Sequence, residues 1–127
     1  MLNLLLVAGG GAAGAVMRHL LGAQAMRAFG TGWPYGTFAA NVVGGLLMGV
    51  LVGVLAFRGG ADQEKWRLLL GVGVLGGFTT FSSYSLEVVL MIQRREWVSA
   101  AAYSLGSVVL SVAALFAGLF LLRRLLA

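Results

Sequence analysis

The chain has 127 residues, of which 60% are hydrophobic and only 10% are charged, and its mean hydropathy is +0.95. A soluble domain of this size has no use for so much apolar surface, so these values predict an integral membrane protein. The lack of cysteine excludes disulfides and thiolate chemistry, and in a membrane protein the net charge of +5 indicates loops at lipid headgroups rather than nucleic-acid binding.

Four apolar stretches of about 20 residues, the length that crosses a bilayer, follow one another along the chain. We predict an all-α membrane protein that forms one integral membrane domain over residues 1–127, with spans at about 4–21, 35–57, 66–92 and 97–122. Trp33, Trp66 and Trp97 stand at the start of the second, third and fourth spans, where a membrane interface favours tryptophan.

The first two spans carry glycines at the spacing of close helix packing. Gly10 and Gly14 form a pair in the first span, and Gly45, Gly49 and Gly53 form a ridge in the second. Small residues four apart let membrane helices approach closely, either within one chain or between two. Because four tightly packed helices leave little central space, a conduction path in this chain would need two copies.

Polar residues in these two spans are few. The only histidine, His19, follows Arg18 at the end of the first predicted span, where an interfacial role suits it better than catalysis. Asn41 lies about seven residues into the second span. A buried amide there serves either as an interhelical hydrogen bond or as part of a path through the membrane.

The third span contains the most informative segment, Gly76–Ser85, which reads GGFTTFSSYS. Two adjacent glycines followed by many hydroxyl residues predict a helix that is broken in mid-membrane. Such a break survives only beside protein or water, and it exposes backbone groups that can hold ions. Helical spacing places Thr80, Ser83 and Glu87 on one face.

Two further patterns are relevant to an ion path through the membrane. Phe81 and Tyr84 are three residues apart, a spacing typical of core packing, although the positive edge of an aromatic ring also suits an anion. In the fourth span, hydroxyls recur every four residues on one face, at Tyr103, Ser107 and Ser111. Isolated serines in membrane helices usually bond to their own helix, but three in register also suit a path.

Charge is nearly absent from the spans. No Lys or Arg lies at the centre of any span, and Glu87 is the only carboxylate within one. Neutral donors can replace the hydration of a small anion without trapping it, and arginines near both faces raise the anion concentration at the mouths. This pattern favours an anion path over a cation path.

The loop charges give little preference for one orientation. Five Lys and Arg residues fall on the side of the termini and four on the other: Arg58, Lys65, Arg67, Arg123 and Arg124 against Arg18, Arg27, Arg94 and Arg95. An excess of one barely orients a protein by the positive-inside rule. We therefore predict dual insertion, with the two forms pairing as an antiparallel dimer, unless a single charge suffices or Arg18 lies too deep to count.

The segments Gly36–Asn41, with Gly44 and Gly45, and Gly76–Glu87 resemble the Fluc-type (CrcB-like) fluoride ion channels. The similarity covers essentially the whole chain. It implies a dual-topology, antiparallel homodimer in the cell (inner) membrane, surrounded by lipid, with two fluoride pores. Such a channel exports cytoplasmic fluoride passively, relieves fluoride toxicity and is not an enzyme.

The resemblance also assigns roles to residues. Asn41 corresponds to the pore-lining asparagine of the family, and Phe81 and Tyr84 take the places of its paired phenylalanines, although the family usually has Phe where this chain has Tyr84. Two more groups match pore-side positions, namely Tyr103, Ser107 and Ser111 in the fourth span, and Thr80, Ser83 and Glu87 in the third.

Two assignments concern other sites. The backbone carbonyls of Gly76 and Thr79 from both subunits correspond to the family's central structural sodium (Na⁺) site, and Arg18 corresponds to an arginine near the vestibule.

Three other functions explain the sequence less well. A small multidrug-resistance-type, proton-coupled cation exporter is also a short four-span antiparallel dimer, but it needs a carboxylate deep in the first span, which has no Asp or Glu here. A non-transporting packing subunit explains the glycines but not the polar faces. An intramembrane enzyme needs a nucleophile–base pair or metal ligands, which the sequence does not offer.

Overall fold

A computed structural model describes residues 1–58 and 60–126, all of them helical or in short connections. Its order along the chain is α1 (Leu2–Phe29), α2 (Tyr35–Arg58), η1 (Gly60–Asp62), α3 (Gln63–Trp66), η2 (Arg67–Leu75), α4 (Gly76–Phe78), α5 (Phe81–Gln93) and α6 (Trp97–Leu126). Four helical stretches, with η1 to α5 counted as one, are long and apolar enough to cross a membrane, which confirms the four predicted spans.

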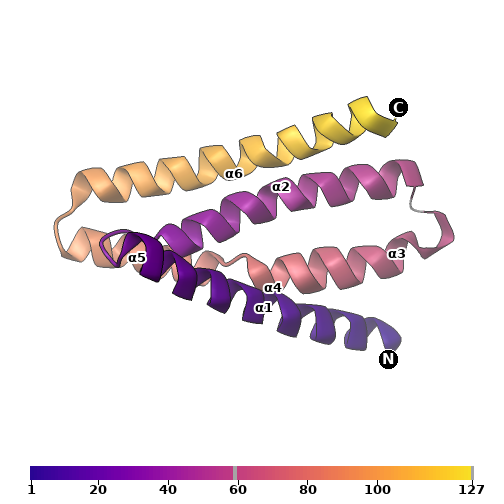
Figure 1. Cartoon of the computed structure of the whole chain (residues 1–127), viewed down its shortest axis with the longest axis horizontal. Helices are drawn as coiled ribbons and strands as arrows, with labels where there is room; N and C mark the ends of the chain where they lie inside the picture. The colour runs from indigo at the N-terminus through magenta and orange to yellow at the C-terminus, as the bar shows by residue number, and fades with distance from the viewer. Residues whose placement is uncertain (59, 127) are drawn as a thin grey trace.

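The four stretches lie roughly along one another (Figure 1), so that both chain ends lie at the same end of the molecule as α3. Large apolar side chains cover the outside, for example Val98 at 84% exposure and Phe116 at 67%. Soluble proteins rarely expose so much contiguous apolar surface, whereas a lipid environment favours it.

The ends of two helices differ from the predicted spans. The first predicted span ends at about residue 21, but α1 continues to Phe29 and stops at Gly30, whose φ of 82° suits glycine. The intervening segment is rich in Ala, Gln, Met and Arg, which are good helix formers, so the helix outlasts its hydrophobic stretch. Helix α6 likewise ends at Leu126 rather than at about 122.

Glycine contacts set the spacing of these helices, as predicted, and they do so within one chain. A Cβ added to Gly49 on α2 would overlap the carbonyl oxygen of Leu115 on α6, and one on Gly45 would lie 2.6 Å from that of Ser111. On α1, a Cβ at Gly14 would overlap the carbonyl oxygen of Val74 in η2. The predicted ridges therefore pair α2 with α6, and α1 with η2 and α4.

The wide helix η2 was not predicted. It runs with π-type hydrogen bonding over nine residues, Arg67–Leu75, immediately before α4. Runs of π-helix are rare and are often found at functional sites. Gly71 and Gly73 are buried in η2, and Gly73 lies against Gly10 of α1, so the wide helix forms where backbones approach closely.

We expect Gly14→Ala to destabilise the folded chain by about 1–3 kcal/mol, because the added methyl group meets a backbone carbonyl that cannot move aside easily. Gly9→Ala is the matched control on the same helix, since its Cβ would meet no atom of this chain within 4 Å. Thermal unfolding of both variants in detergent checks this. Equal midpoints for the two variants would contradict it.

Candidate functional site

Two residues with extended backbone separate α4 from α5. Thr79 has φ −87° and ψ 159°, and Thr80 has φ −153° and ψ 127°. Thr80 then caps α5, because its Oγ1 accepts a hydrogen bond from the Ser83 amide at 3.2 Å. The helix path is thus interrupted within the Gly76–Ser85 segment and restarted by a hydroxyl cap.

Asn41 of α2 holds this interruption in place. Its Nδ2 donates to the Thr80 carbonyl oxygen at 3.2 Å, and its Oδ1 accepts from the Thr80 amide at 2.9 Å. One side-chain amide therefore satisfies both backbone groups of a residue that has left the helix. Of the two roles considered for Asn41, the interhelical hydrogen bond is the one observed, although the side chain also lines a cavity.

The same contacts deprive two backbone carbonyls, those of Gly76 and Thr79, of the amides that would pair with them in a continuous helix. In a continuous helix the Thr80 amide would pair with the Gly76 carbonyl, but it donates to Asn41 instead. The Ser83 amide would pair with the Thr79 carbonyl, but it donates to the Thr80 hydroxyl. Carbonyls at unwound helix segments are a type of group that coordinates cations in membrane proteins. Among the described residues, no group of three or more His, Cys, Asp or Glu suited to a metal occurs.

A cavity of about 450 Å³ opens beside the interruption. It brings together residues from α2, α4, α5, α6 and the segment between α4 and α5. Eight of them are predicted site residues: Asn41, Gly76, Thr79, Thr80, Phe81, Tyr84, Ser107 and Ser111. The Oγ atoms of Ser107 and Ser111 are buried and have no hydrogen-bond partner within residues 1–58 and 60–126. Buried hydroxyls usually have partners, so these two have bonding capacity left for a ligand.

Aromatic rings border this cavity. The ring centroids of Phe81 and Tyr84 are 5.4 Å apart, and Phe81 is 78% exposed in the single chain. The Tyr84 hydroxyl points to α6, where the Ser104 carbonyl oxygen lies 3.4 Å away. Tyr84 therefore presents its ring at the cavity while its hydroxyl is directed at backbone.

Glu87 belongs to a different cluster. Its Oε1 accepts from the Thr37 hydroxyl at 2.7 Å and its Oε2 accepts from the Tyr103 hydroxyl at 2.8 Å. The Tyr103 ring is fully buried, 5.3 Å from that of Tyr84. One carboxylate thus ties α2, α5 and α6 together, and Tyr103 links it to the aromatic border of the smaller cavity.

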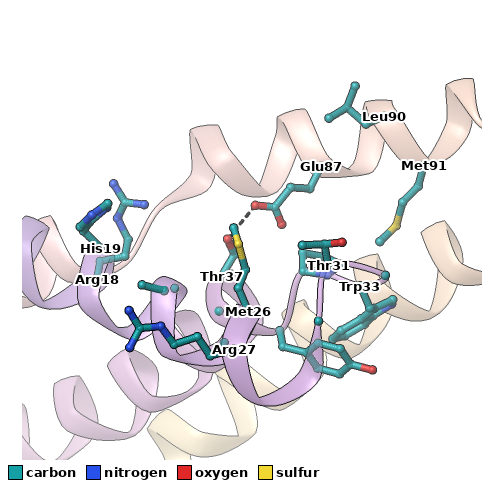
Figure 2. A pocket seen from close by; sticks show the side chains of 18 of the residues that line it. Arg18, His19, Met26, Arg27, Thr31, Trp33, Thr37, Glu87, Leu90 and Met91 are labelled. Atoms are coloured by element: carbon teal, nitrogen blue, oxygen red, sulfur yellow. Dashed lines mark hydrogen bonds between the residues drawn. The ribbon is translucent and has the colours of Figure 1, made fainter.

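A larger cavity, of about 600 Å³, lies on the other side of Glu87. Figure 2 shows Thr37 and Glu87 facing each other there, with Arg18 and His19 beside one another at one edge. The structure therefore places Arg18 with Glu87 and apart from the hydroxyls of the smaller cavity. The Arg18 Nε is buried, with no hydrogen-bond partner in the described part of the chain.

The predicted polar face of the third span needs correction. Because Thr80 is extended and precedes α5, it does not share a helical face with Ser83 and Glu87. Thr80 lines the smaller cavity, Glu87 lines the larger one, and Ser83 lines neither.

The sequence analysis did not single out Thr37, although it lies four residues before Asn41, on the same face of α2.

Comparisons with known proteins agree with this architecture. A family model described as "CrcB-like protein, Camphor Resistance (CrcB)" matches residues 5–119. The chain belongs to this family. A relative from Phenylobacterium zucineum is 73% identical over 124 residues, which cover 98% of each chain. A second relative, from Caulobacter sp. (strain K31), is 62% identical over 125 residues, which also cover 98% of each chain. Both relatives are called fluoride-specific ion channel FluC, so the resemblance to Fluc-type channels is confirmed.

The role of the Asn41 side-chain amide in holding the interruption can be tested by substitution. Asn41→Leu keeps the side-chain size but leaves the Thr80 amide and carbonyl unpaired, so we expect a loss of about 2–4 kcal/mol in the free energy of unfolding. Asn3→Leu, the same change at an exposed position at the start of α1, is the control. Unfolding in detergent measures both, and a loss no greater than that of the control would show that Thr80 does not depend on Asn41.

Proposed function

We propose that this chain is a fluoride-selective ion channel that lets cytoplasmic fluoride leave the cell passively, through one integral membrane domain in the cell (inner) membrane. The observation that carries the proposal is a pair of buried hydroxyls, Ser107 and Ser111, which have no hydrogen-bond partner in the described part of the chain and line a cavity bordered by Phe81 and Tyr84. The names of the relatives, fluoride-specific ion channel FluC, supply the permeant ion.

The lining of the smaller cavity suits a small anion. Within the described residues it includes no Lys, Arg, Asp or Glu, and its polar groups are neutral amide, hydroxyl and backbone groups. A buried hydroxyl left without a partner costs about 1–3 kcal/mol, and an anion that accepts its hydrogen bond removes that cost. Donors without full charge bind weakly enough to let the ion leave, which conduction requires.

The rings add a second kind of neutral donor. An aromatic edge carries partial positive charge, so Phe81 and Tyr84 on the border of the cavity can turn edges toward an anion. The Tyr84 hydroxyl points at the Ser104 carbonyl, which leaves its ring in the role that the family gives to a phenylalanine. Asn41 and Thr80, with Tyr103 linking to Glu87, complete the proposed path.

The proposed channel is an antiparallel homodimer with two pores. In one chain the cavity is open and Phe81 is 78% exposed, so a second copy would complete its wall. The nearly even split of nine Lys and Arg residues between the two sides supports insertion in both orientations. A C-terminal tag accessible from only one side of the membrane would contradict this part of the proposal.

The interruption at Thr79 and Thr80 would then lie in mid-membrane at the dimer axis. The carbonyls of Gly76 and Thr79, released from helical pairing, would hold a structural Na⁺ together with those of the second copy. A cation held there neutralises the partial negative charge of the gathered carbonyls. Gly76 and Thr79 line the smaller cavity, so this site would lie on its wall.

Purified protein in liposomes should release fluoride passively and retain chloride when valinomycin lets potassium carry the balancing charge. Protein-free liposomes are the control for leakage. Equal fluxes of fluoride and chloride would refute the selective channel. Transport that needs a proton gradient and a cationic drug would instead support the multidrug-type exporter.

Two substitutions separate the pore aromatics from packing residues. Phe81→Ile keeps apolar bulk but removes the ring edge, so we expect a folded protein whose fluoride flux falls by about tenfold or more, the equivalent of about 1.4 kcal/mol. Tyr84→Phe removes only a hydroxyl directed at backbone, so its flux should stay close to that of the unmodified protein.

Fluoride efflux from liposomes measures both variants, with size-exclusion chromatography to confirm that each is folded. The reverse result, a normal Phe81→Ile and an inactive Tyr84→Phe, would mean that the Tyr84 hydroxyl binds the ion.

A further inference from the structure

The chain's only histidine lines the larger cavity. His19 follows Arg18 on α1, and Figure 2 shows the two side chains next to each other at the edge of this cavity. Gly22 and Ala23 come three and four residues later, on the same face of α1, and they also line the cavity. The His19 side chain is exposed.

The cavity around His19 is rich in positive charge. Its other charged or titratable lining residues among those described are Arg18 and Arg27 from α1, Tyr35 from α2, Glu87 from α5, and Arg94 directly after α5. The elements η2 and α4, which also pack on α1, carry no titratable side chain between residues 68 and 78. Three guanidinium groups therefore face a single carboxylate.

Two of these charged groups, Glu87 and Arg94, have partners within the chain. The Glu87 carboxylate accepts hydrogen bonds from Thr37 and Tyr103 on its two oxygens, and Arg94 pairs with Glu96 at 2.9 Å. Within the described residues, Arg18 and Arg27 have no ion-pair partner. The neutral hydroxyl donors leave the negative charge of Glu87 in place, so Arg18, Arg27 and Arg94 against Glu87 and Glu96 give one net positive charge around the cavity. A positive charge on His19 would add to it.

The cavity also adjoins the proposed path. Glu87 lines the larger cavity and bonds to Tyr103, whose ring is 5.3 Å from that of Tyr84 on the border of the smaller cavity. Tyr103 and Tyr84 thus stand between the larger cavity and the hydroxyls of the smaller one. In the channel proposed above, the larger cavity would be the entrance to the smaller one.

We propose that His19 is a titratable residue of this entrance, and that its protonation increases the rate at which the channel captures fluoride. The inference rests on the fluoride channel proposed above. Histidine is the side chain that most readily gains a positive charge between neutral and mildly acidic pH. A charge-lined, partly enclosed mouth raises the local concentration of the opposite ion, and salt screens this effect.

Planar bilayer recordings test the proposal, because neutral hydrogen fluoride carries no current. At about 10 mM salt, where the screening length is about 30 Å, we expect fluoride conductance to be about two- to fourfold higher at pH 5.5 than at pH 7.5. This is the factor that one unit charge about 10 Å away gives at an effective dielectric constant of about 40–80. Adding about 0.3 M of an impermeant salt should remove most of the difference.

Three variants identify the residue responsible. His19→Gln should show the low conductance at both pH values, and His19→Lys the high conductance at both. The matched control is the double variant His19→Gln with Gln24→His, which moves the imidazole to an exposed position of α1 outside the cavity lining. It should behave like His19→Gln alone.

The outcomes are distinct. Conductance equal at both pH values in the unmodified protein, or a pH dependence that survives in His19→Gln, overturns the role of His19 while leaving the fluoride channel standing. An unmodified protein with no fluoride conductance at either pH overturns the proposed function and this inference with it.

Discussion

The hydrogen bonds between the Asn41 amide and the backbone of Thr80 are the constraint on which the rest of the site depends. A residue that leaves a helix inside a membrane exposes an amide and a carbonyl that lipid cannot satisfy, at a cost of several kcal/mol. Asn41 supplies one donor and one acceptor to that residue, at 3.2 and 2.9 Å. Asn41 therefore satisfies the backbone of Thr80 without water, and the Thr80 side chain remains available to cap α5.

Close packing of backbones is what brings Asn41 within reach. Gly44 lies one turn after Asn41 on α2, and a Cβ there would overlap the Cγ2 of Thr79. On the opposite side, Gly45 and Gly49 lie against carbonyl oxygens of α6, which fixes the Ser107–Ser111 face relative to α2. The short side chain of an asparagine bridges two helices only at such a separation, so the glycine ridges and the amide act together.

The sequence predicted the spans and the family well, because hydropathy and motif spacing are local properties. It also placed the close helix contacts on the glycine ridges. It could not show that Asn41 bonds to Thr80, because the two residues are 39 positions apart and meet only in the fold. Helical periodicity failed at Thr80 for a related reason, since a pattern with period 3.6 assumes a continuous helix. The ion path, the sodium site and the dimer stay predictions.

The position of Glu87 shows how a chain with one intramembrane carboxylate can still suit an anion path. Two unit charges about 4 Å apart repel by about 4 kcal/mol at an effective dielectric constant of about 20, enough to empty a weak anion site. Glu87 lies instead on the larger cavity, and its two oxygens accept hydrogen bonds from Thr37 and Tyr103. The smaller cavity has only neutral lining groups among the described residues. Tyr103 thus holds the carboxylate on one side of the aromatic border while the unpaired serine hydroxyls lie on the other.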